Sequence, residues 1–245
     1  MDRLEPALRE AMPVSMAGYA LPERAGLIVI DVVDGFCTPG HGPLAPPPGD
    51  TVPARMVDAI AALARRFVTA GKPVLALRDE HVPGRAEPPY PPHCERGSGD
   101  ELLVAELRWL GSEPLATVMP KDCISAPVGA WDGHGNALHE WILAHGLEAV
   151  VLVGICTDIC VSDAVVALLS ARNHHLPGPE GDVPMLGGLR DVVVYEPGCA
   201  TYDLPLATAR ALGLPDASAH PRGPAHHVGL WTMQARGAVL ADALD

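Results

Sequence analysis

Short apolar runs alternate along this chain of 245 residues with segments whose apolar residues recur at helical spacing. The runs are rich in Val, Leu and Ile and predict buried strands at 25–36, 72–81, 116–123, 148–155 and 191–201. The helical pattern predicts helices at 52–71, 101–110, 137–146, 162–173 and 204–213. The helix at 204–213 is expected to be the final helix of the chain. This alternation predicts a three-layer α/β/α fold with a mostly parallel central sheet.

The chain shows no repeat, no linker and no change of composition, so we expect a single domain. Residues 1–24 are expected as an amphipathic N-terminal extension, and residues 25–245 as the domain itself. Residues 174–190 contain Pro and Gly repeatedly and are expected as a surface insertion. The tail carries His226 and His227, and its pattern assigns no element.

Composition excludes several classes of partner. The chain has 30 acidic and 17 basic residues, and this excess argues against nucleic acid or an anionic membrane. No apolar run approaches the roughly 18 residues of a membrane span, and the first twelve residues lack the apolar core of a signal peptide. The six cysteines form no CxxC pair, which favours free thiols in a reducing compartment. We therefore expect a cytoplasmic protein that acts on a small molecule.

Reactive side chains follow four of the predicted strands. Asp31, Asp79, Lys121 and Cys160 each stand where a strand ends. Ligands of parallel sheets bind outside the carboxyl ends of the strands, so these four side chains are expected to share one site. Lys121 is one of only two lysines in the chain, which weakens its reading as an ordinary surface residue.

The segment 150–166, VVLVGICTDICVSDAVV, indicates a strand, a tight turn and a helix that begins near Cys160. A thiol at a helix N-terminus feels the positive end of the helix dipole, which lowers its pKa and favours the thiolate. On this segment alone Cys160 is equally well a small buried hydrophobic residue.

A nucleophilic thiol needs a base, and Asp31 is the candidate, with Asp34 as a competitor for the same role. Lys121 would keep that carboxylate ionised and hold developing negative charge. The backbone N–H groups of Cys156 and Cys160 are the natural oxyanion hole. The turn is also a candidate for a strained or cis peptide bond before Cys156.

A D-x-H pair at the end of the second strand suggests a metal site. Asp79 and His81 point the same way on an extended strand, and the following loop supplies Glu87 and His93. Two imidazoles and two carboxylates suit one divalent metal, with Zn²⁺ first and Fe²⁺ or Mn²⁺ as alternatives. Chance proximity stays an alternative, because the chain contains eleven histidines.

Together these segments resemble the isochorismatase-like cysteine hydrolases, and within them the nicotinamidases of the plant type. The motifs that carry the resemblance recur in the family's order: LIVIDVVDGF, LRDEH, PYPPHCERGSGDEL, MPKDC and VGICTDICV. The plant-type likeness continues through LSARN, GCATYDLP and HHVGL, so the resemblance covers nearly the whole chain from about residue 25 onward.

The resemblance implies a role for each of these residues. It implies that Asp31, Lys121 and Cys160 are catalytic, that Asp79, His81 and His93 bind the metal with Glu87 at a variable fourth position, and that Phe36 and Tyr90 enclose a pyridine ring. The implied reaction is hydrolysis of nicotinamide to nicotinate and ammonia through a Cys160 thioester, in NAD salvage. The metal would anchor the ring. The resemblance also implies a homo-oligomer.

Three other readings remain open. Another amidase of the superfamily, acting on a carbamoyl or ureido compound, would share the Asp, Lys and Cys but generally differs at the D-x-H…H set. A non-catalytic module that binds a metal or a pyridine compound would have no need of the nucleophile. A thiol redox protein using Cys156 and Cys160 is disfavoured by their CxxxC spacing.

Overall fold

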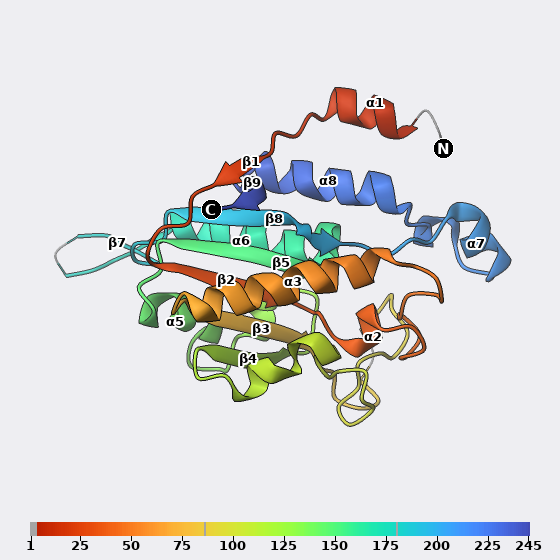
Figure 1. Ribbon diagram of the computed structural model, residues 1–245, viewed down its shortest axis with the longest axis horizontal. Coiled ribbons are helices and arrows are strands. Elements are labelled where there is room, and N and C mark those ends of the chain that lie inside the picture. The colour runs from red at the N-terminus through yellow and green to blue at the C-terminus, as the bar shows by residue number, and fades with distance from the viewer. Residues whose placement is uncertain (1–3, 86, 180) are drawn as a thin grey trace.

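The computed structural model describes residues 4–85, 87–179 and 181–245, and this part of the chain contains one central sheet of seven parallel strands (Figure 1). In order across the sheet, the strands are β1 (Ala17–Tyr19), β9 (Val239–Leu244), β8 (Asp191–Ala200), β5 (Ala149–Ile155), β2 (Ala25–Ile30), β3 (Val74–Asp79) and β4 (Ala116–Lys121). Strands β2 and β5 are buried along their whole length, as expected for a parallel sheet that is covered on both faces.

Helices cover both faces of the sheet. The α-helices are α1 (Leu4–Ala11), α2 (Asp34–Cys37), α3 (Val52–Thr69), α4 (Ala126–Gly129), α5 (Ala137–Ala144), α6 (Ser162–Asn173), α7 (Leu206–Ala211) and α8 (Arg222–Gln234). Helix α3 packs on one face, where its apolar side chains join alternate residues of β2 and β5 in one core. Helices α5, α6 and α8 pack on the other face around the intervening strand residues. The three-layer α/β/α architecture predicted from the sequence is therefore confirmed.

The predicted strands are present, but several are shorter than their apolar runs. The first ends at Ile30 and is followed by the short helix α2, and the segment at 101–110 is a 3-10 helix, η1 (Ala105–Ser112). The expectation that the helix at 204–213 is the final one was wrong, because α8 and β9 follow α7. Helix α8 carries His226 and His227, and these polar residues obscure its apolar face in the sequence.

The two ends of the chain meet at one edge of the sheet. Strand β1 lies within the segment expected as an extension and pairs with β9, which is the last strand of the chain. Three residues are too few to show a strand pattern in the sequence. The division of the chain at residue 24 stays a prediction.

Of the segment expected as a surface insertion, residues 174–179 and 181–184 project from the body of the molecule as a narrow hairpin (Figure 1), whereas Leu186 and Leu189 are buried in the core. Two antiparallel strands of two residues each, β6 (His175–Leu176) and β7 (Val183–Pro184), form it, and both are exposed. Across the described residues, no helix combines the length and the apolar character needed to cross a membrane.

The sheet reverses its order of construction between β2 and β5. Strands β3 and β4 follow β2 on one side, whereas β5, β8 and β9 build outward on the other. A crevice outside the carboxyl ends of the strands is expected at such a reversal. Gly154, with a φ of +133°, allows β5 to approach the end of β2 closely, because a Cβ at this position would lie 2.0 Å from the carbonyl oxygen of Ile30.

Candidate active site

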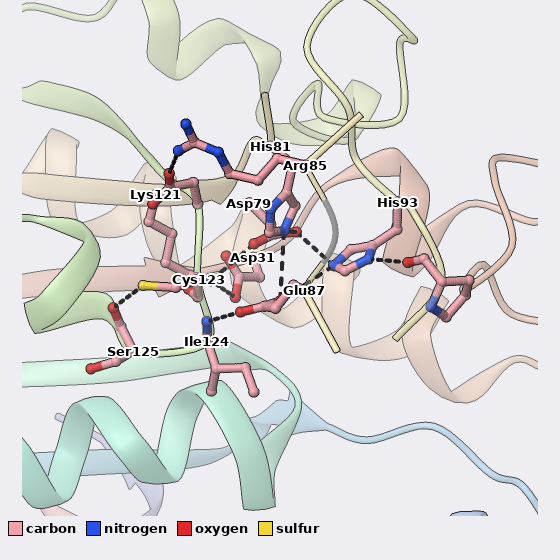
Figure 2. Close-up of polar contacts among 12 residues, drawn as sticks. Asp31, Asp79, His81, Arg85, Glu87, His93, Lys121, Cys123, Ile124 and Ser125 are labelled. Atoms are coloured by element: carbon pink, nitrogen blue, oxygen red, sulfur yellow. Dashed lines mark hydrogen bonds and ion pairs between the residues drawn. The ribbon is translucent and has the colours of Figure 1, made fainter. Parts of the chain in front are cut away.

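Lys121 connects the ends of three neighbouring strands. Its Nζ lies 2.9 Å from Oδ2 of Asp31 and 3.2 Å from Oδ1 of Asp79, and it donates to the carbonyl of Cys123 at 2.8 Å (Figure 2). All three charged side chains are buried. Burial by itself would lower the pKa of Lys121, but the nearby negative charges, Asp31 first, raise it well above its usual value. The ammonium therefore stays charged and offsets the two carboxylates.

Asp31, rather than Asp34, faces this lysine. Asp34 is already engaged, because its Oδ2 lies 2.6 Å from Nη2 of Arg108 and its Oδ1 accepts the hydroxyl of Thr38 at 2.6 Å. Asp31 adopts a φ of +56°, a left-handed conformation that non-glycine residues adopt rarely and that is enriched at functional sites. Burial raises the pKa of Asp31 to about 6, against the opposing charge of Lys121. A carboxyl group with this pKa can accept and return a proton near neutral pH.

Cys160 lies in a π-helical turn, η2 (Thr157–Val161), that joins the end of β5 to α6. It is partly exposed, so a small molecule can reach it. The pKa of its thiol is not lowered as the helix dipole would suggest: burial, and then the neighbouring Asp31 carboxylate, raise it well above its usual value. Cys160 is therefore a protonated thiol beside a base at rest, because these two effects outweigh the dipole.

The turn before Cys160 folds back on itself. The carbonyl of Cys156 accepts the N–H groups of Ile159 and Val161, each at 3.1 Å, and the peptide bond between Ile155 and Cys156 is cis. Cys156 and Cys160 both belong to this connection, whose N–H groups stay the predicted oxyanion hole. All six cysteines, each within the described part of the chain, are free thiols.

Two histidines converge on the second oxygen of Asp79. The Nε2 atoms of His81 and His93 lie 3.1 and 3.2 Å from Oδ2 of Asp79, and Oε2 of Glu87 lies 3.6 and 3.7 Å from the same nitrogens (Figure 2). His93 points its Nδ1 at the carbonyl of Pro91, 2.7 Å away, which favours a proton on Nδ1 and leaves Nε2 as the ligand atom. The other oxygen of Glu87 accepts the N–H of Ile124 at 2.8 Å.

These residues fit a divalent metal. One ligand atom from each of Asp79, His81 and His93 lies within 4.8 Å of the others, and all three residues are buried. Among the described residues, Oδ2 of Asp79 and Nε2 of His81 are buried side-chain atoms without a hydrogen-bond partner, as expected where a cation completes the set. Burial acts to raise the pKa of Asp79, but its contacts with His81 and His93 outweigh this and lower it. The carboxylate is therefore ready to bind a cation.

Two aromatic side chains border this cluster. The ring of Phe36, from α2, has its centroid 5.6 Å from that of His93, and the ring of Tyr90 lies 6.0 Å from the same imidazole. Both side chains are half-buried. The structure brings the two aromatic residues to one histidine, and their contact with a substrate ring stays a prediction.

Polar residues that the sequence pattern did not predict contact the turn around Cys160. Thr157 and Asp158 on the turn bind His226 and His220, which come from the C-terminal region. The signal available in the sequence was the HHVGL motif, which carries His226 but lies in a segment whose pattern assigned no element.

Comparisons with known proteins identify the family and the fold. Residues 25–174 match the model of the isochorismatase domain family. Nicotinamidase 1 of Arabidopsis thaliana is 46% identical over 242 residues, which cover 97% of this chain and 95% of that protein. The crystal structure of a nicotinamidase from Bacillus subtilis shares the fold, with a TM-score of 0.62 at 20% identity over 89% of this chain and 100% of that one.

An amidase with a different substrate also shares the fold. The structure of N-carbamoylsarcosine amidase from Thermoplasma acidophilum has a TM-score of 0.55 at 24% identity, over 82% of this chain and 96% of that one. The fold alone therefore does not separate these two amide substrates.

Proposed function

The chain belongs to the isochorismatase family, and we propose that it is a nicotinamidase, hydrolysing nicotinamide to nicotinate and ammonia. The observation that carries the proposal is that one carboxylate, Asp79, lies against both Lys121 of the Asp31–Lys121 pair and the histidines of a metal cluster. The near full-length similarity to a plant nicotinamidase supports the same substrate. We further propose that the enzyme serves NAD salvage in the cytoplasm and is a homo-oligomer.

Asp31 and Cys160 carry the first chemical step in this proposal. Asp31 accepts the thiol proton as the Cys160 sulfur attacks the carboxamide carbon, and the carbonyl oxygen becomes an oxyanion. The N–H groups of Cys156 and Cys160 donate to that oxygen. The C–N bond then breaks, Asp31 returns its proton to the leaving nitrogen, and ammonia departs from a nicotinoyl thioester on Cys160.

Water completes the reaction through the same groups. Asp31, again a carboxylate, takes a proton from a water molecule that attacks the thioester carbon, and the sulfur leaves and is reprotonated. Lys121 stays charged throughout and offsets the negative charge that moves between Asp31 and Cys160. Because the pair is buried, this compensation acts in a medium of low dielectric constant and is stronger than in water.

Binding and orientation of the ring fall to the neighbouring cluster. Asp79, His81 and His93, with Glu87, would hold a divalent metal, Zn²⁺ first and Fe²⁺ or Mn²⁺ as alternatives. When bound there, such a metal supplies a Lewis acid for the pyridine nitrogen of nicotinamide. Phe36 and Tyr90 would bury the faces of the ring, which adds apolar contact to a flat ligand.

Ammonia release by the purified protein tests the proposal directly. Nicotinamide and N-carbamoylsarcosine are supplied in parallel, with the protein reconstituted in Zn²⁺, Fe²⁺ or Mn²⁺ and also treated with a chelator. We expect release from nicotinamide only, lost on chelation and restored by a metal. Release from the carbamoyl compound alone would favour the other amidase class, and full activity after metal removal would refute the ring-anchoring role.

A further inference from the structure

The turn that carries Cys160 is attached to a part of the chain beyond residue 174, where the family match ends. Thr157 and Asp158 both lie in this π-helical turn, ahead of the nucleophile candidate. Their side chains bind residues of the segment between β8 and α8 and of α8 itself.

Asp158 uses both of its oxygens in these contacts. Its Oδ1 accepts the hydroxyl of Thr201 at 2.7 Å, and its Oδ2 lies 2.8 Å from Nε2 of His220. The Nδ1 of His220 lies 3.0 Å from the carbonyl of Tyr202, and the imidazole stacks on the Tyr202 ring with centroids 3.9 Å apart and planes at 13°. Both ring nitrogens therefore face acceptors, which favours the imidazolium and a charge-assisted bond to Asp158.

The neighbouring residue is held in a similar way. Thr157 is buried, and its hydroxyl lies 2.8 Å from Nδ1 of His226. The Nε2 of His226 lies 3.2 Å from Oε1 of Glu196, so the carboxylate orients the imidazole toward the hydroxyl. The two histidines reach adjacent residues of one turn.

Helix α8 also touches the turn with its backbone. A Cβ at Gly229 would lie 2.8 Å from Cα of Asp158, closer than any real side chain tolerates. The helix that carries His226 is thus packed directly against the turn. Single π-helical turns occur frequently at functional sites, so the contacts that hold this turn bear on the position of Cys160.

We propose that His220 and His226 are positioning residues, which hold the turn at 157–161 so that the Cys160 thiol faces Asp31. Neither histidine is proposed to touch the substrate. The kinetic part of the test rests on the proposed function, whereas the thiol chemistry does not. A displacement of about 1 Å at a reacting atom can lower a rate by about 100-fold, so modest loosening of the turn has a large effect.

The test compares His220→Ala and His226→Ala with a matched control, His227, which follows His226 on α8. His227 is buried in α8, and its Nε2 lies 2.8 Å from the carbonyl of Met12, away from the turn. His227→Ala therefore removes a buried imidazole and a hydrogen bond of similar length without touching Thr157 or Asp158. The conservative variant His220→Gln retains a polar atom near the position of Nε2, which contacts Asp158. His226→Asn likewise retains one near the position of Nδ1, which contacts Thr157.

Two readouts are measured on every variant together with its melting temperature. One is kcat and KM for nicotinamide, and the other is the rate at which iodoacetamide alkylates Cys160, followed by peptide mass spectrometry. In the two alanine variants we expect kcat and the alkylation rate to fall by about tenfold or more while KM changes little. The conservative variants are expected to recover much of both rates, and His227→Ala to keep wild-type rates whatever its melting temperature.

Wild-type alkylation rates in folded His220→Ala and His226→Ala would overturn the proposal, and so would an equal loss in His227→Ala. If the alanine variants do not fold, His220→Phe and His226→Phe decide, because they fill the space of the imidazole without its hydrogen bonds: wild-type alkylation rates in both would refute positioning, and reduced rates at a wild-type melting temperature would support it. Absence of ammonia release from wild type would refute the proposed function, whereas the alkylation comparison would still test the positioning role.

Discussion

Asp79 contacts different residues with each of its two oxygens, and the site divides into two halves at this carboxylate. On Oδ1 lies the charge-balanced half, in which Lys121 connects Asp79 to Asp31 beside Cys160. On Oδ2 lies the metal-site half, in which His81 and His93 approach the carboxylate. The first half contains its own positive charge on Lys121, whereas the groups that approach the carboxylate in the second half are imidazoles. The difference supports the proposal that the first half moves protons and the second binds a cation.

The largest effect is expected in the charge-balanced half, from loss of the nucleophile. Cys160→Ala should lower kcat for nicotinamide by about 10⁴-fold or more, because no other group can form the thioester. Cys156→Ala is the matched control, since only its backbone N–H is assigned a role, and it should keep most of the rate. Loss of activity in Cys156→Ala alone would reassign the nucleophile.

Removal of the buried cation tests how far the first half depends on its own charge. Lys121→Met should lower kcat by about 100-fold, because the charge that offsets Asp31 and the oxyanion is lost. It should also reduce the free energy of unfolding by about 3–5 kcal/mol, since two buried carboxylates lose their partner. Urea unfolding measures this change, with Lys72→Met as the control on the chain's other lysine. Wild-type turnover in a folded Lys121→Met protein would contradict the account.

The metal-site half can be separated from the first by comparing two carboxylates. Asp79→Asn should reduce bound metal and activity by about 10- to 100-fold, because this residue serves both halves. Glu87→Gln should have a smaller effect, since Glu87 lies farther from the histidine nitrogens and its other oxygen binds the N–H of Ile124. Metal analysis and initial rates check both variants. A larger metal loss in Glu87→Gln would reverse the assignment.

The smallest effect concerns pH. Asp31 must be a carboxylate to accept the thiol proton, and burial raises its pKa to about 6. The value of kcat/KM should therefore rise as pH increases through about 6 and then level off. In Lys121→Met the inflection should move to higher pH, because the lysine charge lowers the pKa of Asp31. An inflection that does not move would contradict the coupling between these two residues.

The strand ends were predictable and their surroundings were not. Asp31, Asp79, Lys121 and Cys160 were placed together because parallel strands end at one edge of a sheet. From the residues alone Asp34 competed with Asp31, the family resemblance favoured Asp31, and the structure shows that Asp34 is engaged by Arg108 and Thr38.

Properties that depend on tertiary packing were also hidden in the sequence. The sequence predicted that the pKa of Cys160 is lowered, because the position of the thiol at a helix N-terminus can be recognised there. The structure gives a raised pKa, because burial beside Asp31 depends on the fold. Helix α8 escaped the sequence pattern because its polar residues, His226 and His227, are satisfied by Thr157, Glu196 and Met12, which lie far away in the chain.

The central claim is that Cys160 forms a nicotinoyl thioester, and the most direct measurement is to trap it. The wild-type enzyme, loaded with metal, is quenched with acid during turnover of nicotinamide and mapped by peptide mass spectrometry. The account predicts a nicotinoyl group on the peptide that contains Cys160, located on that residue by fragmentation and absent from Cys160→Ala. A nicotinoyl group on Cys156 instead would contradict the account.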